Sequence, residues 1–243
     1  MATTTKIIPT ITMDSMPGFS WLARLLQVSD STFPTGGYAH SYGFEQVVRF
    51  GLVRDAGSMA LHLEQHLWPM LTYFELPVVR LAQEAALEEN LPALLELDAC
   101  VDATKSAREL REASRATGRQ RLHGFCATAP SPMLNAFARC VDEGHAGAHH
   151  PVIYGIGLAS FPQRAVLTSW AYQSLNAACL SAPKLLRIGQ DAAQRILTGS
   201  LERMEENVAR SLTVSCEGLG WFDPLMELAS MQHEIANERL FIS

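Results

Sequence analysis

The chain has 243 residues, of which 48% are hydrophobic and 18% are charged, and its formal net charge is -6. This composition excludes long-range disorder, and the length suits one large helical domain or two small ones. No basic excess is available for a phosphate backbone, so nucleic acid is not expected as a partner. Low charge combined with abundant Ala and Leu predicts that part of the surface is covered by another subunit or another protein.

The N-terminal segment differs from the rest of the chain. Residues 1–18 are rich in Thr and Pro without hydrophobic periodicity, and they are predicted to form a mobile tail. They lack the continuous apolar core of a signal peptide. The five cysteines are scattered and never form a C-x-x-C pair, which favours reduced thiols and a cytoplasmic protein. Residues 19–243 are predicted to form one domain.

Helical spacing of apolar residues begins directly after this tail. The first apolar face is predicted to contain Trp21, Leu22, Leu25, Leu26 and Val28. Asp55 is predicted to cap the next long helix, whose apolar residues are Leu61, Leu67, Trp68 and Leu71. Asn90 is predicted to separate a helix through Val78 from another through Leu94.

Prolines mark the later helix starts. Ser131 and Asp223 are each predicted to cap a helix that begins at the following proline. Three further starts are predicted at Pro151, Pro162 and Pro183.

The segment from Ala165 to Pro183 contains no Asp, Glu, Lys or Arg. Its Ser, Thr, Asn and Gln residues make it too polar to span lipid, so a helix at the centre of a bundle is predicted, and no membrane partner. No alternating strand with a turn partner is found. The predicted fold class is all-α, a single helical bundle-like domain of about ten helices.

Two turn-rich segments interrupt the helical pattern. The glycine loop, residues 30–38, contains Gly36 and Gly37, and a second loop covers residues 143–150. A P-loop is excluded because no strand precedes the two glycines and no Lys follows them. A tight turn explains the glycines equally well. Loops held by a rigid scaffold often carry function, so both segments are candidate sites.

Histidines raise the question of a metal site. One group, in the second loop, comprises His145, His149 and His150, and another pair, four residues apart on a predicted helix, is His62 and His66. Neither spacing matches a closed structural site, and the H-E-x-x-H arrangement is absent. Structural roles are favoured. The alternative function is a helical metal-dependent hydrolase using His62, His66, His145 and His149.

A dense basic helix stands out in this acidic chain. Its cationic stripe recurs every three or four residues and consists of Lys105, Arg108, Arg111, Arg115 and Arg119. The stripe is either a solvated face, with Glu109 and Glu112 pairing locally at about 0.2–0.5 kcal/mol each, or a docking site for an acidic partner, since Arg binds carboxylates in a bidentate way. The residue pattern leaves both alternatives open.

The chain ends on an apolar segment. The C-terminal tail, residues 239–243, reads Arg239-Leu240-Phe241-Ile242-Ser243 and continues the helical pattern of Leu225, Leu228 and Ile235. Chain ends are normally frayed and polar. The tail is therefore expected either to fold back onto the core or to insert into a partner.

Four blocks, spread from Leu22 to the chain end, resemble the urease accessory protein UreF family. The first contains Phe33-Pro34-Thr35-Gly36-Gly37-Tyr38 and then Ser41, Gly43, Phe44 and Glu45. The second is the basic helix with Gly118. The third is His149-His150-Pro151-Val152-Ile153-Tyr154-Gly155, followed by the uncharged helix and Ile188-Gly189-Gln190. The fourth is His233-Glu234 with the C-terminal tail. The chain departs from the family at Arg187-Ile188, where Pro-Leu is more usual.

The resemblance implies an all-α, non-catalytic protein of the cytoplasm that helps insert nickel into urease and carries no cofactor of its own. Members of the family dimerise and bind the accessory protein UreD, also called UreH, and the GTPase UreG. The whole assembly delivers nickel to apo-urease, with UreF thought to bridge UreD and UreG and proposed to regulate the GTPase.

The resemblance also implies where partners would bind. The implied partner-binding residues lie in three places: in and just after the glycine loop, in the cationic stripe, and in the C-terminal tail. They are Pro34, Gly36, Gly37, Tyr38, Ser41, Gly43, Glu45, Lys105, Arg108, Arg111, Arg115, Arg119, Arg239, Leu240, Phe241 and Ile242. The glycine loop would face UreG and the tail would order against UreD. A weaker expectation is that His149 and His150 touch transiting nickel.

Overall fold

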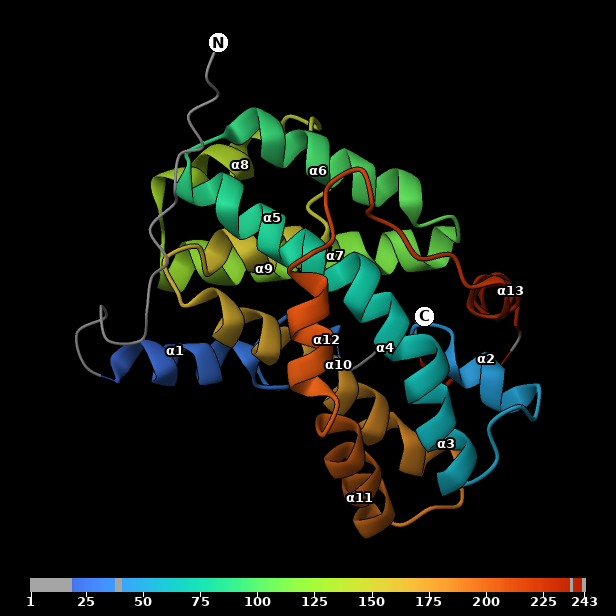
Figure 1. Cartoon of the computed structure of the whole chain (residues 1–243). Helices are drawn as coiled ribbons and strands as arrows, with labels where there is room; N and C mark the ends of the chain where they lie inside the picture. Colours follow the sequence, from blue (N-terminus) through green and yellow to red (C-terminus); the bar gives the residue numbers. More distant parts are fainter. Residues whose placement is uncertain (1–18, 38–40, 237, 242–243) are drawn as a thin grey trace.

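The computed structural model describes residues 19–37, 41–236 and 238–241. Every regular element within these residues is helical, which confirms the predicted all-α fold (Figure 1). The predictions made for residues 1–18, Tyr38 and Ile242 lie outside the described residues. Among the residues described, none of the helices combines the length and apolar character that a bilayer crossing requires.

The helices have the following bounds in chain order: α1 Ser20–Ser29, α2 Phe44–Arg49, α3 Ala56–His62, α4 Trp68–Met70, α5 Leu76–Leu87, α6 Leu91–Thr104, α7 Arg108–Thr128, α8 Pro132–Asp142, α9 His150–Gly157, α10 Gln163–Leu185, α11 Gln190–Leu201, α12 Met204–Ser211 and α13 Pro224–Glu234. Two π-helical turns, η3 (Leu63–Leu67) and η4 (Leu71–Glu75), join α3, α4 and α5 into one run. With that run taken as one helix, the described residues form eleven helices, close to the ten predicted.

The π-helical turns explain how this run tolerates two internal prolines. Pro69 and Pro77 each lack the backbone N–H that an α-helix needs, and each ring would collide with the carbonyl four residues earlier. A π turn ends two residues before each of them and widens the helix there. The run from Ala56 to Leu87 therefore continues across the molecule without a break (Figure 1).

The core is organised around α9. This short helix is apolar on all sides and packs against both α5 and α7. Val152, Ile153 and Tyr154 are completely buried, as expected for a helix without a polar face. The predicted central helix, α10, buries only one side: Trp170 and Leu175 lie in the core. Its opposite side reaches the surface.

The three predicted caps, at Asp55, Ser131 and Asp223, are confirmed, and Asn90, predicted only to separate two helices, is a cap as well. The side chains of Asp55, Asn90, Ser131 and Asp223 each accept a hydrogen bond from a backbone N–H in the first turn of the following helix. Asp55 and Ser58 form a reciprocal capping box. These contacts are local, which is why the sequence pattern predicts them correctly.

Three expectations were wrong in detail. Pro183 does not begin a helix but lies in the last turn of α10. The helix ends two residues later, so the backbone hydrogen bond that Pro183 cannot donate is lost only in the final turn, where it costs little. The neighbouring Ala182 is fully buried. Leu26 and Leu61, assigned to apolar faces, are 63% and 52% exposed, because the buried face of each helix is formed by residues one or two positions away, such as Leu25 and His62, and not by residues one helical turn away.

Gly118 allows α7 to cross the chain just before α9. A Cβ atom at this position would lie 1.9 Å from the carbonyl oxygen of Ala148 and 2.8 Å from the amide nitrogen of His150. Both neighbours are backbone atoms that cannot rotate away. Close packing of α7 against the start of α9 thus requires glycine at this position.

We expect Gly118→Ala to lower the free energy of unfolding by about 3 kcal/mol, because overpacking displaces backbone. Gly199, inside α11, is the matched control, since an added Cβ there meets no heavy atom within 4 Å. Gly199→Ala should raise stability by about 0.5–1 kcal/mol. Urea unfolding followed by circular dichroism measures both changes, and an unchanged Gly118→Ala variant would contradict the crossing geometry.

Candidate functional site

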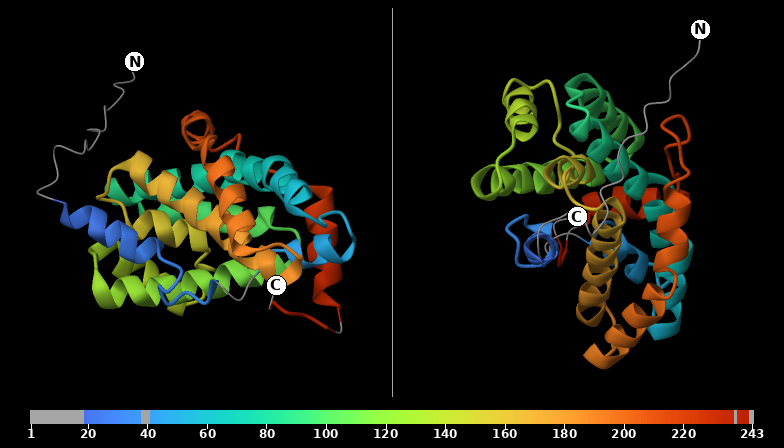
Figure 2. Two further views of the ribbon diagram at one scale, coloured as in Figure 1. Left: turned by 90° about the horizontal axis from the view of Figure 1, so that it is seen from below. Right: turned by 60° about the vertical axis from the view of Figure 1, so that its left-hand side comes forward.

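The segment after the glycine loop packs directly against the last helix. Gly43 precedes α2 with a left-handed φ of 85°. A Cβ atom there would lie 2.6 Å from Oγ of Ser230 on α13, so glycine is required both by conformation and by space. Figure 2 shows α2 and α13 side by side in both views.

Glu45, on α2, holds the C-terminal tail. Its carboxylate accepts hydrogen bonds from the backbone N–H of Leu240 at 3.0 and 3.1 Å and of Phe241 at 3.0 Å. Arg49, one turn further along α2, donates to the same carboxylate at 2.8 Å. Phe241 is buried, whereas Leu240 is 70% exposed. The described part of the tail therefore folds back onto the protein and leaves one large apolar side chain outside.

His233 joins this arrangement to α7. Its Nε2 lies 3.2 Å from the Glu45 carboxylate, and its Nδ1 lies 2.8 Å from the Glu109 carboxylate. Arg239 lies 3.4 Å from the same oxygen of Glu109. Each ring nitrogen of His233 thus faces one carboxylate. We call this set the tail clamp; its members are Glu45, Arg49, Glu109, His233 and Arg239.

The tail clamp keeps Glu45 ionised. Burial acts to raise the pKa of Glu45, but hydrogen bonds from the two tail amides, the imidazole and the guanidinium outweigh it and leave the pKa below its usual value. A carboxyl with a lowered pKa in the folded state adds stability above its unfolded-state pKa of 4.5. That stability is lost as the pH falls through the lower folded-state value.

The glycine loop is partly open to solvent. Pro34 and Gly36 are exposed, while Gly37 and Ser41 are half-buried. Gly36 adopts a left-handed φ of 73°, as a tight turn requires. Gly43 and Glu45 are themselves buried, so they can affect a partner only through the segments that they hold.

The cationic stripe is largely engaged within the chain. Lys105 lies 3.4 Å from the carboxylate of Glu75, and Arg111 donates to the carbonyl oxygen of Lys105 at 2.8 Å. Arg108 pairs with Glu234 on α13. Arg119 remains exposed on α7.

Of the two local carboxylates expected to pair with the stripe, only one does so as predicted. Arg115 pairs with Glu112 at 2.8 Å and also with Asp102 on α6. Glu109 turns instead toward His233 and Arg239 of the tail clamp. The stripe thus serves in part to join α7 to α6 and α13.

The structure places His149 and His150 in structural networks. His149 is fully buried, with its ring nitrogens 2.9 Å from Asp102 and 3.1 Å from Ser114, and burial lowers its pKa. Nε2 of His150 faces Nε of the buried Arg121 at 2.7 Å. No three His, Cys, Asp or Glu side chains in the described part of the chain are grouped so that they could hold a metal ion.

The other two histidines named for a metal site form a pair beside α13. The rings of His62 and His66 lie 5.0 Å apart, and Nδ1 of His66 lies 2.5 Å from the Asp223 carboxylate. Burial lowers the pKa of His62 to about 4, with the neighbouring His66 acting in the same direction. His145 is exposed on the loop after α8, beside Glu143, and does not belong to this helical run.

Reasoning from the sequence missed most of the tail clamp. Glu109 was considered only as a local partner for the stripe, and Arg49 and His233 were not considered as site residues. His233 does fall within the fourth family block, which was the available signal. The contact itself joins residues 188 positions apart, which no local pattern encodes.

These features define a class of protein: an all-helical protein whose buried charges hold its segments in place. Residues 53–201 match the UreF family model. The chain is 30% identical to urease accessory protein UreF of Arthrobacter sp. (strain FB24) over 92% of this chain and 98% of that protein. The corresponding protein of Bacillus sp. (strain TB-90) is 31% identical over 91% and 99%. The chain belongs to the UreF family of urease accessory proteins, which is not catalytic, so the hydrolase alternative is set aside.

We expect Glu45→Gln to release the tail, because an amide cannot accept from two backbone N–H groups and the guanidinium as a carboxylate does. Amide hydrogen exchange at Leu240 and Phe241 should become faster, and the free energy of unfolding should fall by about 3 kcal/mol. Glu202→Gln, at an exposed position, is the matched control. Unchanged exchange at both amides would refute the role of the tail clamp.

We expect His62 to make the protein less stable in mild acid. Its pKa falls from 6.5 to about 4 on folding, so the unfolded chain takes up the proton first as the pH drops below 6.5. The stability lost between pH 7 and pH 5 should be about 2 kcal/mol from this residue. Urea unfolding at both pH values should show a smaller loss in His62→Gln, and no such reduction in His145→Gln, whose side chain is 67% exposed.

Proposed function

We propose that this chain is an adaptor in urease maturation, which bridges UreD (UreH) and the GTPase UreG while nickel is inserted into apo-urease. Nickel is the cargo of this assembly, and the chain needs no cofactor of its own. The observation that carries the proposal is the tail clamp, which holds the C-terminal tail against α2 in a member of the UreF family.

Exposed apolar side chains on α13, just after α2 and just after α13, and in the tail support a partner surface here. They are between 44% and 72% exposed and comprise Phe50, Leu52, Leu228, Met231, Ile235 and Leu240. Apolar side chains gathered in this way commonly mark protein–protein contacts. In this proposal the tail and α13 bind UreD, and the glycine loop faces UreG.

The proposal includes a homodimer in the cytoplasm. Tyr172 and Leu180, both on α10, are each 42% exposed, on the side of the helix that reaches the surface. A second copy of the chain would cover these side chains and explain why α10 is apolar beyond its buried face.

The test is co-expression of this chain with UreD and UreG, followed by size-exclusion chromatography with light scattering. We expect UreG to co-elute with UreD only when this chain is present, in a complex whose mass contains two copies of it. The adaptor proposal fails if the chain elutes alone while UreD and UreG are both folded.

Two variants of the same chain separate the roles of the tail and the loop. Deletion of residues 240–243 should weaken UreD binding, and Gly37→Val should weaken recruitment of UreG. The matched control is Gly57→Val, at an exposed glycine whose added Cβ meets only the Asp55 carboxylate at 3.5 Å. Full UreG recruitment by Gly37→Val would remove the glycine loop from the proposed interface.

A further inference from the structure

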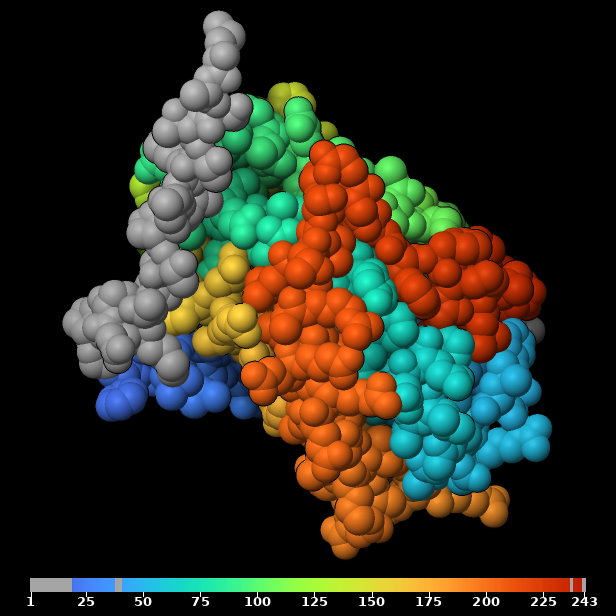
Figure 3. All heavy atoms as spheres, in the orientation of Figure 1, coloured from blue at the N-terminus to red at the C-terminus, as the bar shows by residue number. Residues whose placement is uncertain are grey.

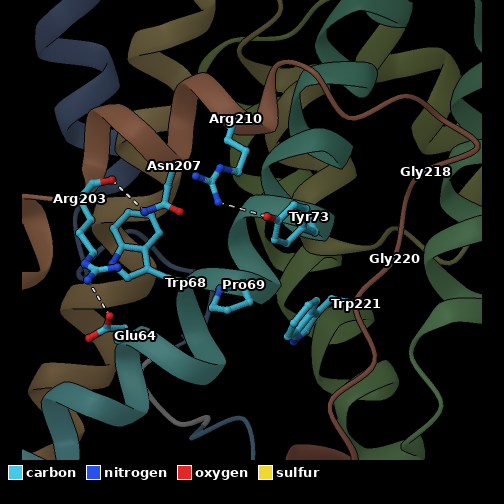
Figure 4. A pocket seen from close by; sticks show the side chains of 10 residues that line it. All are labelled: Glu64, Trp68, Pro69, Tyr73, Arg203, Asn207, Arg210, Gly218, Gly220 and Trp221. Atoms are coloured by element: carbon cyan, nitrogen blue, oxygen red, sulfur yellow. Dashed lines mark hydrogen bonds and ion pairs between the residues drawn. The ribbon is translucent and has the colours of Figure 1, made fainter.

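A groove runs along the helix that contains the two π turns. Its larger hollow, about 560 Å³, is bounded by that helix, by α12 with the residue before it, and by residues 218–221 (Figure 4). An adjoining hollow of about 330 Å³ lies between α3 and α11. The two hollows share Glu64, Trp68 and Arg203. Figure 3 shows α11 and α12 beside this helical run on one face of the molecule.

The charge of this groove is opposite to that of the chain. The chain carries a net charge of -6, yet the charged residues lining the two hollows are Arg195, Arg203, Arg210 and one carboxylate, Glu64. Arg203 pairs with Glu64 at 2.6 Å, but both side chains are about half exposed, so the pair is accessible. A guanidinium in such a position can bind a second carboxylate.

Aromatic side chains form one wall of the larger hollow. The rings of Tyr73 and Trp221 stack at 5.9 Å with an angle of 22° between them. The N–H of Gly220 donates to the carbonyl oxygen of Tyr73 at 3.3 Å and ties this segment to the helix. Arg210 donates to the Tyr73 hydroxyl at 3.3 Å and pairs with Glu206, one turn earlier on α12, at 2.7 Å, and half of its side chain remains exposed. An aromatic wall beside a guanidinium fits a ligand with both an apolar and an acidic group.

The indole N–H of Trp68 is a separate indication of a ligand. Trp68 lines both hollows and is only 2% exposed. Its Nε1 is buried and has no hydrogen-bond acceptor among the residues described. Buried donors are nearly always satisfied by protein, water or ligand. An acceptor oxygen of a ligand in the groove would accept a hydrogen bond from the Trp68 indole N–H, directly or through a water molecule.

We propose that this groove binds an acidic segment of a partner protein. Carboxylates of the segment bind Arg203 and Arg210, and an aromatic or apolar side chain packs on Trp221. Two open hollows in line fit an extended peptide better than a small molecule, which usually binds in one enclosing pocket. The proposal goes beyond the adaptor role, because it depends on neither UreD nor UreG.

The test uses the full chain and three synthetic pentapeptides, capped at both ends, that differ only in charge: Glu-Glu-Phe-Glu-Glu, Gln-Gln-Phe-Gln-Gln and Lys-Lys-Phe-Lys-Lys. Intrinsic tryptophan fluorescence reports binding, because Trp68 and Trp221 line the groove while Trp21 and Trp170 lie in the core. We expect a saturable change with the acidic peptide alone, and weaker binding as NaCl is raised.

Variants then locate the binding. Arg203→Gln and Arg210→Gln should each weaken binding of the acidic peptide at least roughly tenfold, because each removes a charge-assisted pair. Arg164→Gln, an exposed arginine on α10, is the matched control and should bind as the wild type does. Both Arg203 and Arg210 are about half exposed, so their variants are expected to fold, which circular dichroism verifies.

Several results would overturn the proposal. One is the absence of a saturable response to the acidic peptide, and another is equal binding of the Gln peptide. Binding that is unchanged in both groove variants would place the peptide elsewhere. If inorganic phosphate binds with the same dependence on Arg203 while the acidic peptide does not, the groove is a phosphate site and the assignment to a protein segment is wrong.

Discussion

The carboxylate of Glu45 joins two ends of the protein that lie nearly two hundred residues apart. A buried charge is costly unless its hydrogen bonds are complete. Here they come from two tail amides, the imidazole of His233 and the guanidinium of Arg49. The amides come from the tail, the imidazole from α13 and the guanidinium from α2, so this one carboxylate fixes the positions of all three segments together. Displacement of any one leaves the carboxylate under-satisfied.

The same principle holds α13 at both of its ends. Asp223 caps the start of the helix and also lies 2.5 Å from His66 on the central helical run. His233, in the last turn, lies between two carboxylates. Because these polar contacts position the helix, its packing does not require the apolar side chains of Leu228 and Ile235, which stay outside. The sequence pattern assigned Leu228 and Ile235 to the same apolar stripe as Leu225, but Leu225 is half-buried whereas the other two are exposed.

Local signals predicted the fold well, whereas the site depends on contacts that are distant in sequence. The caps at Asp55, Asn90, Ser131 and Asp223 involve neighbours within three residues, and all four are present. The glycine loop and the tail were identified from composition and family resemblance, but not the carboxylate that connects them. The basic helix was predicted to begin at Lys105, but α7 begins at Arg108 and Lys105 is the C-cap of α6. The four arginines of the stripe lie on α7 at the predicted spacing, yet their partners come from α6 and α13 as well as from their own helix. The spacing of charged residues shows that they share one face of a helix, but it does not show which residues that face contacts.

The prolines of the central run show how an unfavourable residue can shape a surface. Pro69 and Pro77 would normally end or kink a helix, and here a π turn precedes each one. Glu64, Trp68 and Tyr73 all lie in or beside these turns and all line the same hollow. Trp221, on its opposite side, stands two residues before the Asp223 that caps α13. One helix therefore connects the groove at its beginning with the tail clamp at its end, and the two surfaces cannot be positioned independently.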